Sequence, residues 1–329
     1  MSMQSNLAIN EMKLLFDNEN KIHPWQEMPT ALKFKDLRES HQLTIVMPIY
    51  NQKNQIFSVL NKIVINLKNK SSLIIIDDAS EDESGEEVIR FINEVALSNE
   101  KIVSIIFITN HTPIYETACD NQGFLLAKTE YIIEVQADIH IEELDFDQKM
   151  IDSMATNNLG AVSGRLAHSF SIIDYSPKWK KWFKYPRRML LKKMNRVVDG
   201  VGLIDERIFT GELINVSKNQ LTYIAETVAR GPWLIKKSDL EKVNYLDEKN
   251  FFLGHDDHDY HRKIWVQLGK HVGYVPIKIF SFAEHGSTRK IRGGLNLEIY
   301  RYLVEHKNGA GDYRKFLDHY IPYQEIQAV

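Results

Sequence analysis

Residues 131–143, YIIEVQADIHIEE, decide how the rest of the chain is interpreted. They open as an apolar run that continues to Val135, and Asp138 and His140 follow where the apolar character stops. Residues i and i+2 of a strand lie on the same face, so we expect this carboxylate and this imidazole to point the same way. Both are ligands for a divalent metal, and open α/β sheets hold ligands at the carboxyl ends of their strands. The stretch predicts the centre of an active site; a turn-starting aspartate beside a solvated histidine is the plainer alternative.

Four apolar runs alternate with three segments of helical periodicity in the first half of the chain. The predicted strands cover 43–47, 72–76, 102–109 and the run from Tyr131, and the predicted helices cover 55–67, 86–97 and 115–127. This alternation is typical of right-handed βαβ units around a parallel sheet. Nearly continuous apolar strands are expected where helices cover both faces. We therefore expect an α/β domain with a central, mostly parallel, Rossmann-like sheet flanked by helices.

Polar residues stand directly after each predicted strand. In chain order they are Pro48 to Asn51, Asp77 with Asp78, Asn110, and Asp138 with His140. The carboxyl ends of parallel strands meet at one edge, so these side chains are expected to share a crevice. An acidic residue there can accept hydrogen bonds from a nucleoside, although a helix cap or a turn is an equally ordinary use of such a pair. No G-x-G-x-x-G or G-x-x-x-x-G-K-[ST] loop follows a strand, which argues against a dinucleotide site and a P-loop.

Composition sets the outer bounds on function. The chain has 329 residues, 43% of them hydrophobic and 26% charged, and a formal net charge of -3, so no nucleic-acid partner is expected. One cysteine, Cys119, excludes an intrachain disulfide and fits a reducing compartment. No uncharged run approaches a membrane-spanning length. We expect a cytoplasmic protein, with association at the cytoplasmic face of a membrane as the open alternative.

Several motifs in the same order carry a resemblance to a known family. VMPIYN, IIIDDAS, CDNQGFLLAKTEYI and VQADIH resemble the nucleotide-binding half of family 2 glycosyltransferases, which have the glycosyltransferase A-type fold. In the second half, the segment from GPWLIKKSD to GHDDHDYHRK resembles the acceptor half of that family, and AEHGSTRK resembles its closing loop. The similar segments run from about residue 43 to about residue 290. The resemblance implies a sugar transferase that uses a nucleotide-diphosphate sugar, most often a UDP-sugar.

The resemblance also implies roles for individual residues. The implied donor-binding set is Pro48, Tyr50, Asn51, Asp77, Asp78, Asn110, Gln136, Ala137, Arg289 and Lys290, with Arg292 as a further candidate at the diphosphate. Asp138, His140 and His285 are the implied ligands of Mn²⁺ or Mg²⁺. The family's Asp-x-Asp motif has Gln136 in place of its first acid, and Asp138-Ile139-His140 is similar to the Asp-x-His variant of polypeptide N-acetylgalactosaminyltransferases. Asp120 stands where an arginine is common, and Thr129 where a glycine is common.

The implied general base lies in the acidic cluster Gly254 to Asp259. The family's acidic pair aligns with Asp256-Asp257, which assigns the base to Asp257 with Asp256 as the alternative. A neighbouring like charge raises the pKa of one carboxyl of such a pair, which suits a base. A solvated helix start, with aspartates favoured by the helix dipole, is the alternative without catalysis. Direct attack opposite the leaving group predicts inversion, and the lack of a Gln-x-x-Arg-Trp motif predicts a single transfer per encounter.

A basic, aromatic segment separates the two halves. Residues 178–196, KWKKWFKYPRRMLLKKMNR, could contact an anionic membrane surface, a glycan or single-stranded nucleic acid, or could be a solvated helix. We expect an N-terminal extension (1–42) with one or two short helices, a catalytic domain (43–292) and a C-terminal helical appendage (293–329). Within the catalytic domain we expect a nucleotide-sugar half (43–143), a basic insertion (170–202) and an acceptor half (228–292).

Together these observations predict an inverting, metal-dependent, non-processive hexosyl- or N-acetylhexosaminyltransferase of polysaccharide biosynthesis. Its acceptor would be a hydroxyl of a glycan or of a lipid-linked molecule. Two competitors stay open. A nucleotide-sugar or glycan-binding protein that has lost catalysis is favoured by Gln136, and a sugar-phosphate nucleotidyltransferase would need a glycine-rich phosphate loop, which the stretch 48–55 lacks.

Overall fold

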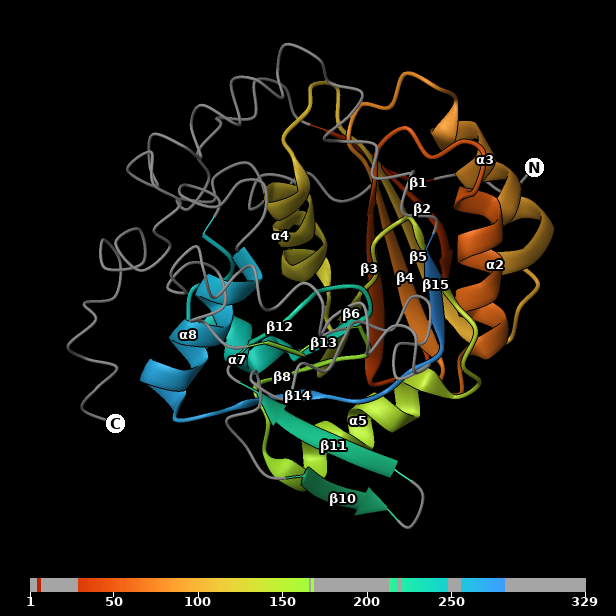
Figure 1. The fold of residues 1–329 in the computed structure, drawn as a ribbon. Helices are drawn as coiled ribbons and strands as arrows, with labels where there is room; N and C mark the ends of the chain where they lie inside the picture. Colours follow the sequence, from red (N-terminus) through yellow and green to blue (C-terminus); the bar gives the residue numbers. More distant parts are fainter. Residues whose placement is uncertain are drawn as a thin grey trace, which may run out of the picture.

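The structure is a computed structural model that describes residues 5–6, 29–165, 167–168, 213–217, 220–225, 227–247 and 256–281. Figure 1 shows a twisted sheet with helices on both of its faces, which confirms the expected α/β fold. Three expected features lie outside the described residues: the basic insertion at 170–202, the closing loop with His285, Arg289, Lys290 and Arg292, and the appendage at 293–329.

The main sheet has parallel strands at its centre and antiparallel strands on both sides. Its described order is β1-β2-β5-β4-β3-β6-β13-β8-β14-β11-β10, and β3, β4, β5 and β6 are mutually parallel where they pair. Two small two-stranded sheets, β12-β9 and β15-β7, lie beside it. The strands are β1 Ser5–Asn6, β2 Thr30–Asp36, β3 Leu43–Ile49, β4 Ser71–Asp77, β5 Ile102–Thr109, β6 Tyr131–Glu134, β7 Ile139–Ile141, β8 Ala161–Ser163, β9 Ala167–His168, β10 Leu213–Ser217, β11 Gln220–Ala225, β12 Thr227–Val228, β13 Trp233–Lys236, β14 Val272–Tyr274 and β15 Ile279–Ser281.

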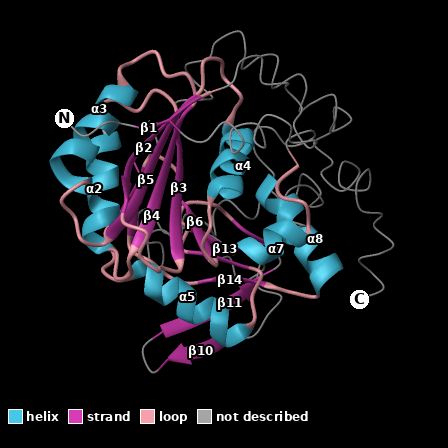
Figure 2. Cartoon of the chain, turned by 180° about the vertical axis from the view of Figure 1, so that it is seen from behind, coloured by secondary structure: helices cyan, strands magenta, loops and turns pink. Residues whose placement is uncertain are grey.

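The helices divide between the two faces of the sheet, as Figures 1 and 2 show from opposite sides. Residues of α2, α3 and α5 pack into one apolar cluster, and residues of α4, α7 and α8 pack into the other. Helix α2 shows why: the apolar residues that recur at helical spacing on one face, Ile56, Val59, Leu60, Ile63 and Val64, are buried, whereas Ile65 on another face is exposed. The described helices are α2 Ile56–Asn66, α3 Ser84–Phe91 with a π-helical turn at Ile92–Ala96, α4 Glu116–Leu126, α5 Phe146–Asn157, α7 Lys237–Lys242 and α8 Asp256–Leu268.

Strand β13 joins the two halves of the chain. It lies between β6 and β8 and pairs antiparallel with both, so Trp233 stands opposite Glu134 on one side and Ser163 on the other. Trp233 is fully buried. The segment resembling the acceptor half is therefore built into the sheet of the nucleotide-binding half, and a shift of one half would break strand pairing.

A buried histidine holds α8 to this strand. The indole Nε1 of Trp233 donates to His261 Nε2 at 3.0 Å, and His261 Nδ1 lies 2.9 Å from the hydroxyl of Thr227. The backbone N–H of Val228 also donates to Nδ1 at 3.5 Å. His261 therefore connects α8 to β13 and β12 through both ring nitrogens.

Two sequence expectations about secondary structure are wrong. Short helices were expected in residues 1–42, but Thr30–Asp36 form β2, which pairs antiparallel with β5, so the central sheet begins before residue 43. The strand from Tyr131 was expected to carry both Asp138 and His140, but β6 ends at Glu134. Asp138 lies in a turn, and His140 belongs to β7, paired with β15. The same-face argument for these two residues therefore does not apply.

One finding concerns membranes. Among the residues that the structure describes, no helix combines the length and the apolar character needed to cross a bilayer.

The packing of α4 on β3 depends on a glycine. A Cβ at Gly123 would lie 2.3 Å from Val46 Cγ1, which is fully buried in β3. We expect Gly123→Ala to lower the free energy of unfolding by about 1–3 kcal/mol, because overpacking outweighs the gain of roughly 1 kcal/mol in helix propensity. Urea denaturation would measure it. Combining Gly123→Ala with Val46→Ala should cost less than the sum of the single changes, and strict additivity would contradict the clash.

Candidate active site

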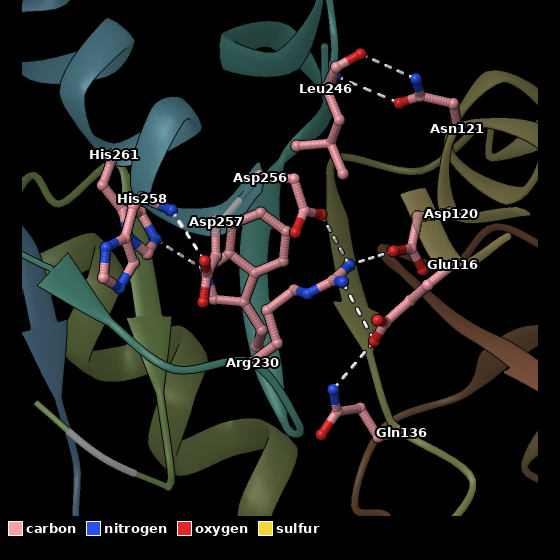
Figure 3. A network of polar contacts seen from close by, with 11 residues as sticks. Glu116, Asp120, Asn121, Gln136, Arg230, Leu246, Asp256, Asp257, His258 and His261 are labelled. Carbon is pink, nitrogen blue, oxygen red and sulfur yellow. Dashed lines mark hydrogen bonds and ion pairs between the residues drawn. The ribbon is translucent and has the colours of Figure 1, made fainter. Parts of the chain in front are cut away.

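The guanidinium of Arg230 is the centre of a buried network between the two halves of the chain (Figure 3). Arg230 is only 4% exposed. Its Nη2 lies 3.0 Å from Glu116 Oε1, its Nη1 lies 3.0 Å from Asp256 Oδ2, and Nη1 also pairs with Asp120. Glu116 and Asp120 are one turn apart on α4, and Asp256 is the first residue of α8. One cation therefore ties α4 to the start of α8.

The network continues to the turn that precedes β7. The amide Nε2 of Gln136 donates to Glu116 Oε1 at 2.9 Å, and its Oε1 accepts from Arg165 Nη1. Arg165 also donates to the backbone carbonyl of Arg230 at 3.3 Å. Gln136 stands two residues before Asp138, so the ion cluster reaches the turn in which metal binding was predicted.

Asp257, the predicted base, lies beside this network on the first turn of α8. Its Oδ1 accepts the backbone N–H of His258 at 2.8 Å, and its side chain is half-buried, whereas Asp256 is fully buried. The N-terminal end of a helix favours a carboxylate. Asp256 is paired to Arg230, so Asp257 is the member of the pair that is partly exposed.

The carboxyls around Arg230 outnumber the cations. Burial raises the pKa of Glu134 to about 8, of Asp256 to about 7 and of Asp257 to about 6, in each case against the opposing charge of Arg230. Burial also raises the pKa of Asp120 well above its usual range. Glu134 is fully buried at the end of β6, and neither of its carboxyl oxygens has a hydrogen-bond partner among the residues that the structure describes. The site thus holds carboxyl protons near neutral pH.

Two acids after β4 organise the neighbouring loops. Asp78 accepts from the backbone N–H groups of Ile114 and Tyr115 at 2.8 and 3.0 Å, and from the amide of Asn110 at 3.2 Å. Asp77 accepts from the N–H of Ser80 at 3.0 Å, and burial raises its pKa. Both carboxylates are buried. Asp78 fixes the loop that leads into α4, and their contact with a nucleoside stays a prediction.

The turn after β3 is locked to the turn after β4. Asn51 adopts a left-handed backbone conformation with φ of 51°, its N–H donates to the hydroxyl of Ser80, and its side-chain oxygen accepts the N–H of Glu81. Asn and Asp tolerate this conformation better than most residues. The predicted donor residues Pro48, Tyr50 and Asn51 therefore share one rigid edge with Asp77 and Asp78.

The structure describes two of the three predicted metal ligands, Asp138 and His140. Asp138 Oδ2 lies 3.4 Å from the hydroxyl of Ser281 on β15, and His140 stands opposite Phe280 on the same strand. Carboxylate oxygen and imidazole nitrogen suit Mn²⁺. Within the described ranges no three His, Cys, Asp or Glu side chains form a metal-binding group. The carboxylate and the imidazole are chemically suitable ligands for this ion. The set is incomplete without the predicted third ligand, His285, which lies outside those ranges.

Sequence reasoning missed most of the Arg230 network. It picked out Asp256, Asp257 and Gln136, but not Arg230, Glu116, Glu134 or Arg165. One signal was present: Asp120 was noted as an acid where an arginine is common. In the structure Asp120 pairs with Arg230, so the cation at this place comes from a different segment of the chain.

The family assignment follows from the sequence match. The model of glycosyl transferase family 2 matches residues 44–209, which is half of the chain. The protein belongs to glycosyl transferase family 2. A curated relative, the dolichyl-phosphate beta-glucosyltransferase of Dictyostelium discoideum, is 25% identical over 177 residues, covering 49% of this chain and 53% of that protein. The chain thus matches about half the length of this relative.

Solved structures support the fold. S. aureus TarS 1-349 in complex with UDP-GlcNAc has a TM-score of 0.50 and 12% identity, over 86% of this chain and 73% of that chain. GalNAc-T7 with UDP, GalNAc and Mn²⁺ has a TM-score of 0.50 and 13% identity, over 73% of this chain and 44% of that chain. At this identity the likeness shows a shared fold and no more.

The buried carboxyls make stability depend on pH. The folded-state pKa of Glu134 is about 8 against an ordinary value of 4.5, so the folded protein binds this proton more tightly than the unfolded chain does. The resulting stabilisation is full below the ordinary value and is lost as pH rises through about 8. We expect the melting temperature to fall from pH 5 to pH 8, and Glu134→Gln to reduce that fall.

Glu130→Gln, at the exposed end of the same segment, is the control and should leave the pH dependence as it is in wild type. If the melting temperature falls equally with pH in wild type and in Glu134→Gln, then Glu134 is ionised in the folded protein and the prediction is wrong.

Proposed function

We propose that the protein is an inverting, metal-dependent and non-processive glycosyltransferase with Asp257 as its general base. The observation that carries this proposal is the Arg230 network, which places the first turn of α8 beside α4 and the Gln136 turn. A base on α8 would then face a donor bound at the carboxyl edge of the parallel strands. We further propose that residues 43–292 work as one catalytic unit, to which β2 adds a strand beside β5.

The proposed donor is a nucleotide-diphosphate sugar. Support comes from the family and from the bound molecules named for two neighbours, UDP-GlcNAc in TarS and UDP with GalNAc and Mn²⁺ in GalNAc-T7. On this chain the nucleoside would lie against the turns after β3 and β4, near Tyr50, Asn51 and Asp77. Arg289 and Lys290 would meet the diphosphate. A UDP-sugar is the first donor to test.

Asp138 and His140, with His285, would hold Mn²⁺ or Mg²⁺. When bound, such an ion neutralises the charge that develops on the departing diphosphate. The chain's own part is to present one carboxylate and one imidazole at the edge of the β15-β7 sheet, which is chemically suited to either ion.

Asp257 would take the proton of the acceptor hydroxyl as that oxygen attacks the anomeric carbon. A new carbon–oxygen bond forms on the face opposite the diphosphate, the bond to the diphosphate oxygen breaks, and its electron pair leaves with the nucleoside diphosphate. The configuration of the anomeric carbon therefore inverts. A carboxyl with a pKa of about 6 is largely ionised at neutral pH and still basic enough to accept this proton.

The acceptor is proposed to be a glycan or a lipid-linked molecule. The curated relative's name, dolichyl-phosphate beta-glucosyltransferase, supports including lipid-linked acceptors that carry a free hydroxyl in the first tests. Contact with a membrane face through residues 178–196, and a place in polysaccharide biosynthesis in the cytoplasm, belong to the same proposal.

Donor and metal are tested by thermal shift with a panel of nucleotide sugars, in Mn²⁺ and in chelator. One donor should raise the melting temperature in Mn²⁺ only, and the paired change Asp138→Asn with His140→Gln should remove that dependence on Mn²⁺. A Mn²⁺-independent shift in wild type would contradict the metal site. No shift with any nucleotide sugar would overturn the transferase proposal.

The base is tested by Asp257→Asn. We expect transfer or donor hydrolysis to fall by roughly 10²–10⁴-fold with donor affinity unchanged, because the proton acceptor is lost and the donor contacts are not. Asp152→Asn, the same change at an exposed position on α5, is the control. Equal loss in both variants would show that the loss is not specific to Asp257.

A further inference from the structure

We propose that Arg230 is a positioning residue of the reaction: it fixes the first turn of α8, and thereby Asp257, against α4 and the Gln136 turn. The proposal rests on the role of Asp257 proposed above. Arg230 acts through Asp256, to which it is paired at 3.0 Å, and not by touching the substrate.

The backbone that carries Arg230 is held in place from its other side. Ser163 donates its hydroxyl to the carbonyl of Ala229, the N–H of Gly164 donates to the carbonyl of Pro232 at 3.1 Å, and Arg165 donates to the carbonyl of Arg230. The segment then runs directly into β13. The backbone at Arg230 is therefore held in place by hydrogen bonds, and this fixes where the guanidinium meets its three carboxylate partners.

The guanidinium of Arg230 is too enclosed by its carboxylate partners to bind a diphosphate as well. Glu116, Asp120 and Asp256 surround a side chain that is 4% exposed. A diphosphate would have to displace these carboxylates and bring its own negative charge beside the ones that remain. The geometry therefore favours a residue that orders the site over one that binds the donor.

Gln136 connects the Arg230 network to the turn that carries Asp138. Its amide accepts from Arg165 and donates to Glu116, and only a group that has both a donor and an acceptor can make this link. An ionised acid at this position would set a second carboxylate against Glu116. The replacement of the first acid of the Asp-x-Asp motif by glutamine is explained by this bridge, which joins the turn of Asp138 to the Arg230 network.

The charges around Asp257 make the proposal testable through the pH dependence of kcat/KM. Burial raises the pKa of Asp257, Arg230 and Arg165 lower it, and Glu116 raises it. Asp256 is its neighbour on the same turn, and the carboxyls of Asp120 and Glu134 face Arg230 from α4 and β6. Removing the Arg230 cation should therefore raise the pKa of Asp257, whereas a packing defect that lets water reach Asp257 should lower it.

The test compares Arg230→Met and Arg230→Lys with wild type in donor hydrolysis or transfer. We expect kcat to fall by roughly 10- to 100-fold in both variants, because misplacing a catalytic group has costs of this size, with the donor KM within about twofold of wild type. The acid limb of the kcat/KM profile should move to higher pH in Arg230→Met and less in Arg230→Lys, which keeps the charge without the fork that meets three carboxylates. Arg90→Lys, at an exposed position on α3, is the matched control.

A raised donor KM with an unmoved acid limb would overturn the proposal and make Arg230 a donor-binding residue. Full kcat in the Arg230 variants would overturn it as well. If both variants fail to fold, Glu116→Gln decides: loss of kcat at unchanged KM supports the positioning role, and wild-type kcat contradicts it. Failure of the proposed function is seen separately, as absence of turnover in wild type or full turnover in Asp257→Asn.

Discussion

The burial of one guanidinium among several carboxyls is the constraint on which the rest of the site depends. Taking Arg230 out of water costs several kcal/mol, and the cost is offset only while its carboxylate partners stay in contact. Those partners come from α4 and from the start of α8, and Gln136 joins the turn before β7 to them. Because removing one partner of a buried pair costs about 3–5 kcal/mol, these elements must keep their relative positions for the protein to stay folded. The contacts that keep the protein folded are therefore also the contacts that position the proposed base.

The donor edge is built by a different use of acidic residues. Asp78 accepts backbone N–H groups at the entrance of α4, and Asn51 locks the turn after β3 to the turn after β4. These contacts satisfy backbone groups that a loop at a sheet edge would otherwise leave to water. A rigid edge of this kind loses little conformational entropy when a ligand binds. The parallel centre of the sheet supplies the edge, and β13 ties the segment carrying the base to it.

Local patterns predicted much of this structure, and contacts between distant residues accounted for most of the rest. The helical spacing of apolar residues located α2, and the apolar runs located β3, β4 and β5. Strand β2 was missed because its half-buried, mixed-polarity sequence is typical of an edge strand and of a loop alike. The break between β6 and β7 was missed because an apolar run does not show where pairing partners change. The Arg230 network includes contacts between residues far apart in the sequence, such as Arg230 and Asp120, which are 110 positions apart, and no local pattern reports such a contact.

We propose that Arg230 orders the site while the donor binds elsewhere on the same edge. The decisive measurement is an experimental structure with a nucleoside diphosphate and Mn²⁺. We expect the nucleoside at the turns after β3 and β4, the ion at Asp138 and His140, and Arg230 still paired with Asp256 and Glu116. An Arg230 side chain that has left Asp256 to contact the diphosphate would contradict it.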